Sequence, residues 1–104
     1  MDKERVICLH ERDNVITTLD FIPKGTLLPK QKLKTLEDIS FGHKIALYQI
    51  EMGEKVIKYG TPIGEAIQTI PKGAHVHLHN LKSLQWKGET IEGLQEVGWK
   101  NRNT

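Results

Sequence analysis

The sequence predicts a small, mostly-β domain. Apolar residues occur in short, alternating or β-branched runs, and within 74–80 three histidines alternate with Val76 and Leu78. A turn built on proline or glycine recurs three times along the chain. No segment shows the long amphipathic pattern of a surface helix. Together these observations indicate short strands joined by tight corners.

Length and composition fit one soluble domain with a modest core. The chain has 104 residues, 38% of them hydrophobic and 27% charged, and a formal net charge of +2. That charge is too small and too mixed to indicate a nucleic-acid or membrane partner. Cys8 is the single cysteine, so no internal disulfide can form, and its apolar neighbours predict a buried thiol. With no signal peptide or membrane-spanning run in view, we expect a cytoplasmic protein.

The elements are predicted from the spacing of apolar and turn-forming residues. A polar turn is expected over 11–14 and a tight connection over 60–64, because Pro62 has no N–H for a central strand. Residues 31–39 fit either a helix face or a strand, and 65–70 fit a strand or one helical turn. Strands are predicted over 6–10, 15–19, 44–50, 55–59 and 74–80.

The recurring corner occupies residues 22–28, 50–56 and 70–76. Each copy has an apolar anchor, two turn-compatible residues, a glycine, two further residues and a second apolar position. The glycine supplies a positive φ, and proline after the anchor presets the first corner in two of the copies. We therefore predict a repeated turn that launches a strand each time.

The chain changes character after Leu81. We predict a domain over 1–82 and a C-terminal tail or linker over 83–104. Trp86 and Trp99 in that tail fit two interpretations, as docking residues for a partner or as a lid on the small core.

The alternating stretch 74–80 predicts a row of imidazoles. On a strand, alternate side chains point to opposite faces, so His75, His77 and His79 would share one face. Val76 and Leu78 would then pack inward on the other face. The remainder of the chain is interpreted as a scaffold that presents this row.

Four motifs give the chain a family resemblance. In order they are Asp13-Asn14-Val15, the segment 42–47 (Gly-His-Lys-Ile-Ala-Leu), the segment 57–64 (Ile-Lys-Tyr-Gly-Thr-Pro-Ile-Gly) and the segment 76–80 (Val-His-Leu-His-Asn). Together, over residues 4–82, they resemble the SAF domain of the altronate/galactarate dehydratase family, which includes the small subunit of sulfolactate sulfo-lyase. The resemblance implies an SAF, or β-clip, fold that is mostly β with short helical turns.

The resemblance also implies an activity. Members of this family eliminate water or sulfite from a sugar acid or hydroxy acid, and the dehydratases use a divalent metal, often iron. The SAF part is a small N-terminal domain or a separate small subunit. We therefore expect a large catalytic subunit or domain and a sugar acid as partners, with no nucleic acid and no membrane; homo-oligomerisation is left open.

His77 and His79 match the family pattern, which implies that they are the catalytic residues and the metal ligands. Elimination needs a base for the proton α to the carboxylate and an acid or metal for the leaving hydroxyl. Imidazole suits either role near neutral pH. On one strand face the two residues would stand roughly 6 to 7 Å apart at the backbone, close enough to share one ion. His75 departs from the pattern and ranks below them.

Four further residues are substrate-binding candidates. His43 and Lys44 add an imidazole and a cation that could attract a sugar-acid carboxylate. Asn80 could bind a carboxylate or hydroxyl, or simply end the strand. Asn14 is a candidate through its motif alone, since an Asp13-Asn14 pair is otherwise an ordinary turn.

Two other functions compete with the lyase. One is a non-catalytic SAF module that binds a carbohydrate or a protein. The other is a structural β-domain whose histidines are ordinary surface residues, because a His-x-His pair without further ligand spacing is a weak metal signal.

Overall fold

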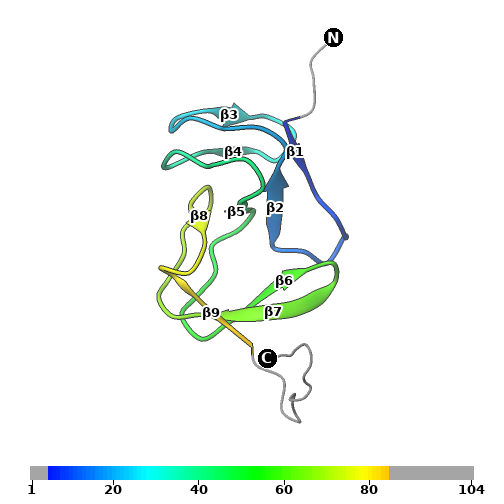
Figure 1. Cartoon of the computed structure of the whole chain (residues 1–104), viewed down its shortest axis with the longest axis vertical. Helices are drawn as coiled ribbons and strands as arrows, with labels where there is room; N and C mark the ends of the chain where they lie inside the picture. The colour runs from blue at the N-terminus through cyan, green and yellow to red at the C-terminus, as the bar shows by residue number, and fades with distance from the viewer. Residues whose placement is uncertain (1–4, 85–104) are drawn as a thin grey trace.

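The structure is a computed structural model that describes residues 5–84. Over this range the chain forms short β-strands in three antiparallel sheets, and no helix occurs among these residues (Figure 1). The prediction of a mostly-β fold is confirmed. The strands are β1 (Val6–Ile7), β2 (Val15–Thr18), β3 (Leu27–Leu28), β4 (Leu33–Lys34), β5 (Lys44–Ala46), β6 (Lys55–Lys58), β7 (Thr61–Ala66), β8 (His75–Val76) and β9 (Leu81–Ser83).

A four-stranded sheet in the order β1-β2-β5-β8 forms the middle of the molecule. The β3–β4 hairpin lies beyond one end of this sheet, and the three-stranded sheet β6-β7-β9 lies beyond the other (Figure 1). β4 falls within 31–39, the segment for which the sequence allowed helix or strand, and pairing of Leu27 with Lys34 decides for strand. No helix among the described residues is long and apolar enough to cross a membrane.

The recurring corner is confirmed, and the structure adds a fourth copy. Gly25, Gly53 and Gly73 have φ values of 84°, 91° and 90°, as the turn requires. Residues 39–45 repeat the same spacing, with Gly42 at φ 82°. Proline is absent from this copy, and its shape is carried by the glycine and the two apolar positions alone.

The anchor isoleucines of the four corners pair with one another. Ile22 and Ile39 exchange both backbone hydrogen bonds at 2.8 Å, and Ile50 and Ile70 do the same at 2.8 and 2.7 Å. All four side chains are fully buried. The backbone hydrogen bonds between the anchors therefore join the corners in two pairs, with the anchor side chains in the core.

The core divides into two apolar clusters that follow these pairs. Burial of such side chains is the main stabilising contribution in a domain of this size. The first cluster contains Val6, Ile16, Ile22, Leu28, Leu33, Ile39 and Ile45. The second contains Val15, Ala46, Ile50, Val56, Ala66, Ile70, Ala74, Val76 and Leu81.

Asp13 and Asn14 join the first turn to the β6–β7 hairpin. The buried Asp13 carboxylate accepts hydrogen bonds from the backbone N–H groups of Tyr59 at 3.1 Å and Gly60 at 2.8 Å. The Asn14 amide accepts from the N–H of Ile57 at 2.8 Å and donates to a β6 carbonyl at 3.0 Å. Both side chains thus hold two sheets together.

The expectation of a tight connection over 60–64 is wrong. β7 begins at Thr61 and is the middle strand of its sheet, although it contains Pro62. It tolerates this proline because β9 pairs only with Gly64 to Ala66, and because the register with β6 shifts between Val56 and Ile57.

Leu78 and Cys8 were predicted to be buried, but both are exposed. Leu78 is 70% exposed, since β8 ends at Val76 and the chain turns before the alternation can continue. Cys8 is exposed beyond the two-residue β1, where its thiol lies 3.3 Å from the carbonyl of His10.

The predicted division of the chain falls near the end of the described range. The boundary between residues 82 and 83 lies within β9, which ends at Ser83. Trp86, Trp99 and the rest of the predicted tail beyond residue 84 lie outside the described residues.

Candidate metal centre

Two of the corners carry the imidazoles to one place. His43 directly precedes β5, and β8 contains His75; these strands pair, with Ile45 opposite His75 and Lys44 opposite Val76. The buried Thr18 fixes the His43 corner, because its hydroxyl accepts the N–H of His43 at 3.2 Å and donates to the carbonyl of Ser40 at 2.7 Å. Sheet pairing therefore brings together histidines that are 32 residues apart.

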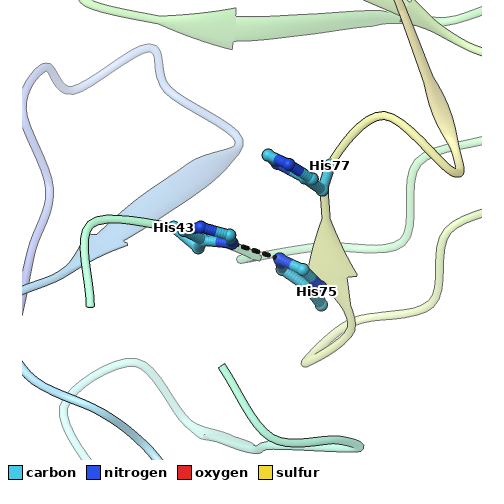
Figure 2. Close-up of side chains that lie close together, drawn as sticks. All are labelled: His43, His75 and His77. Atoms are coloured by element: carbon cyan, nitrogen blue, oxygen red, sulfur yellow. Dashed lines mark hydrogen bonds between the residues drawn. The ribbon is translucent and has the colours of Figure 1, made fainter. Parts of the chain in front are cut away.

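The rings of His43, His75 and His77 form a compact group (Figure 2). Nδ1 of His43 lies 2.8 Å from Nε2 of His75, so one ring donates a hydrogen bond and the other accepts it. The ring centres of His43 and His77 are 4.6 Å apart, and those of His75 and His77 are 5.4 Å apart; both pairs are nearly parallel. One ring nitrogen from each of the three residues lies within 4.8 Å of the others.

Asn80 holds the turn that carries the other histidines. Its side chain is 3% exposed, its Oδ1 accepts the N–H of His77 at 3.0 Å, and its Nδ2 donates to the carbonyl of His75 at 2.8 Å. The N–H of Asn80 also bonds the carbonyl of His77 at 3.1 Å. Residues 77–80 thus form a turn rather than the predicted strand. The rings still gather, because this turn brings the ring centre of His79 to 5.3 Å from the ring centre of His75.

Glu37 is the carboxylate of the site. Its Oε2 accepts the backbone N–H of His75 at 3.0 Å. A carboxylate oxygen of Glu37 and ring nitrogens of His75 and His79 lie within 4.8 Å of one another. His75 therefore belongs to two donor groups, one made of three imidazoles and one made of two imidazoles and a carboxylate.

Burial and neighbouring charge affect protonation in the cluster. Burial lowers the pKa of His75, and positive charge on His43 lowers it further, while Glu37 acts in the opposite direction. Burial, His43 and Lys44 lower the pKa of His77. Burial and nearby Lys58 lower the pKa of Lys44. The two histidines are thus held neutral near pH 7, the form that binds metals and accepts protons.

The structure brings together most of the sequence-predicted site residues. His43, His77, His79 and Asn80 meet around His75, and Lys44 follows His43. Asn14 is engaged by the backbone of β6, and its predicted substrate contact stays a prediction.

Two residues stand out that the sequence did not favour. His75 is central to both donor groups although it ranked below the other histidines, and the alternation itself was its signal. Glu37 was not predicted. It stands 38 residues before His75 in an ambiguous segment, and no local pattern joins the two.

Comparisons with known proteins agree with the resemblance. A family described as "Altronate/galactarate dehydratase SAF domain" matches residues 4–84. The altronate dehydratase of Bacillus subtilis is 43% identical over 79 residues, which are 74% of this chain and 16% of that protein. The galactarate dehydratase (L-threo-forming) of Escherichia coli is 38% identical over 72 residues, 67% of this chain and 14% of that protein.

A much shorter relative is also similar. The (2R)-sulfolactate sulfo-lyase subunit alpha of Paracoccus pantotrophus is 42% identical over 55 residues, which are 53% of this chain and 82% of that subunit. The chain thus spans about a sixth of the length of the dehydratases that it matches and most of the length of a sulfo-lyase subunit.

Proposed function

We propose that this chain, which belongs to the SAF-domain family of the altronate/galactarate dehydratases, is the small subunit or N-terminal domain of a hydro-lyase. Its substrate is a sugar acid such as altronate or galactarate. The observation that carries the proposal is the convergence of four histidines from two corners on one half-exposed site.

The chain's own residues suit an elimination. A neutral His77 accepts the proton α to the substrate carboxylate, and the ammonium of Lys44 attracts that carboxylate. The hydroxyl on the neighbouring carbon leaves as water after it takes up a proton, for which His79 or His43 is the donor. Asn80 positions His75 and His77 through the backbone.

The donor set also fits a divalent metal such as iron. Imidazole nitrogens with a carboxylate are ligands that iron, zinc and manganese accept. When bound, such a metal supplies Lewis-acid assistance to the departing hydroxyl. The family pattern implies His77 and His79 as its ligands, and a histidine that held the metal would act as a ligand in place of its proton-transfer role.

A larger protein part completes this site in the proposal. The dehydratase relatives extend far beyond the matched segment, which makes up 16% of their length. Phe41 and Leu78, which are close in sequence to His43, His77 and His79, are each 70% exposed and offer apolar area to a covering part. We propose that the large catalytic part covers the histidine face.

The test is reconstitution. The chain is combined with a large lyase subunit from the same genome, and loss of altronate, loss of galactarate and sulfite release from sulfolactate are assayed. We expect no turnover by the isolated chain and turnover by the complex. His77→Ala should lower kcat by about 100-fold or more, the usual contribution of a general base, whereas His10→Ala, at an exposed histidine outside the cluster, should not change it.

Full activity of both the His77→Ala and His79→Ala complexes would refute the catalytic role. Binding of a sugar acid by the isolated chain, without metal or partner and without turnover in the complex, would instead support the non-catalytic binding module.

A further inference from the structure

We infer that Glu37, His75 and His79 form the primary cation site of this chain, distinct from the group of His43, His75 and His77. This site differs from a His77–His79 pair in two of its ligands. The site consists of this chain's own residues, and the inference does not depend on the proposed lyase activity.

Three residues from two segments of the chain supply the donor atoms of this site. Glu37 comes from the segment before the corner at 39–45, and His75 and His79 come from the corner at 70–76 and the turn that follows it; one donor atom of each lies within 4.8 Å of the others. A metal with bonds of about 2.1 Å holds its ligand atoms roughly 3 to 4 Å apart. Small changes in side-chain rotamers are therefore sufficient to close the three donors around an ion.

His75 is the residue that the two donor groups share. Its Nε2 is directed at Nδ1 of His43, 2.8 Å away. Imidazole has a second ring nitrogen that points in a different direction, so the same ring can also serve the Glu37 side. The ring of His79 is tilted by 40° to that of His75, whereas the rings of His43 and His77 stack nearly parallel to it.

Charge distinguishes the two donor groups. Glu37 brings a negative charge that offsets part of the charge of a divalent cation. The group of His43, His75 and His77 contains three imidazoles and no anion, and the positive charge of Lys44 acts on His77. A cation is therefore favoured beside Glu37, and an anion such as a carboxylate is favoured beside His77 and Lys44.

The carboxylate is already held in place. The N–H of His75 donates to Oε2 of Glu37 at 3.0 Å, which orients the side chain and leaves the other oxygen free to bind an ion. Two imidazoles and one carboxylate are a recurrent donor set for Zn²⁺ and Fe²⁺ and leave coordination positions for water or substrate.

The experiment measures metal binding by the full chain without partner or substrate. Zn²⁺ is titrated by calorimetry into the wild type, Glu37→Gln and His79→Asn, with His43→Asn and His77→Asn as matched variants in the other donor group. Circular dichroism verifies that each variant is folded. We expect Glu37→Gln and His79→Asn to raise the Kd by about tenfold or more and the other two to change it by less than about threefold.

A second measurement uses the unmodified protein. In spectra of the imidazole ¹⁵N nuclei, Zn²⁺ should shift His75 and His79 and leave the His43 and His77 resonances much less affected. The inference is overturned if Glu37→Gln binds as the wild type does, if His43→Asn or His77→Asn abolishes binding, or if the wild type binds no Zn²⁺. Loss of lyase activity in a reconstituted enzyme with Zn²⁺ binding intact would count against the proposed function alone.

Discussion

Single polar side chains hold this small domain together at points where strands are too short to do so. The carboxylate of Asp13 is 3% exposed and accepts two backbone N–H groups from the turn between β6 and β7. A buried group of this kind is costly to lose, since its partners are left without a hydrogen bond. These hydrogen bonds explain the presence of Asp13 in the first motif, and no role in binding is needed to explain it.

Asp13→Ala should lower the free energy of unfolding by about 1 to 3 kcal/mol, because two part-buried hydrogen bonds lose their acceptor. Urea unfolding of the full chain measures this change. Glu11→Ala, at an exposed position in the same turn, should change stability by less than about 0.5 kcal/mol. Equal effects of the two substitutions would contradict the assigned role.

Asn80 acts at the same scale on the candidate site. Its amide bonds the N–H of His77 and the carbonyl of His75, so it orders the turn that carries the imidazoles. Asn80→Ala should weaken Zn²⁺ binding by roughly tenfold, as the loss of an outer-shell contact does. Unchanged binding by a folded Asn80→Ala protein, measured by calorimetry, would show that the turn needs no such support.

At the scale of elements, the corner is the repeating unit of the fold. Its glycine allows the reversal, and its anchor isoleucine ties one corner to another. The corners differ in what surrounds the glycine. A Cβ at Gly73 would collide with the backbone carbonyl of Lys34, whereas a Cβ at Gly53 would meet nothing within 4 Å.

This difference separates backbone strain from packing. Gly53→Ala should cost about 1 to 2 kcal/mol, the cost of a positive φ for a residue with a side chain. Gly73→Ala has nearly the same φ and should cost clearly more, because the β4 backbone must also move. Thermal or urea unfolding of both variants tests this; equal losses of stability would mean that packing against Lys34 contributes nothing.

At the scale of the whole molecule, stability and the histidine cluster are linked through pH. Burial lowers the pKa of His75 and of His77. Above the ordinary histidine value of about 6.5 both rings are neutral in the folded and the unfolded chain, and they contribute no pH dependence. Below it the unfolded chain takes up protons first, so the folded state loses stability until the folded rings also titrate.

The free energy of unfolding should therefore fall between pH 7.5 and pH 5.5 in metal-free protein. The double variant His75→Asn, His77→Asn should show a smaller fall over the same range, because the two groups with lowered pKa values are gone. Urea unfolding at both pH values provides the measurement. Identical pH slopes for the two proteins would contradict this account.

The sequence by itself determined the class of fold and its repeating corner, because glycine spacing and buried isoleucines act within seven residues. It also placed His75, His77 and His79 together, although through an alternating strand that ends at Val76. Only the tertiary structure decided that His43 and Glu37 join them. Their approach depends on pairing of β5 with β8 and on a hydrogen bond across 38 residues, and no local pattern encodes contacts made at that distance.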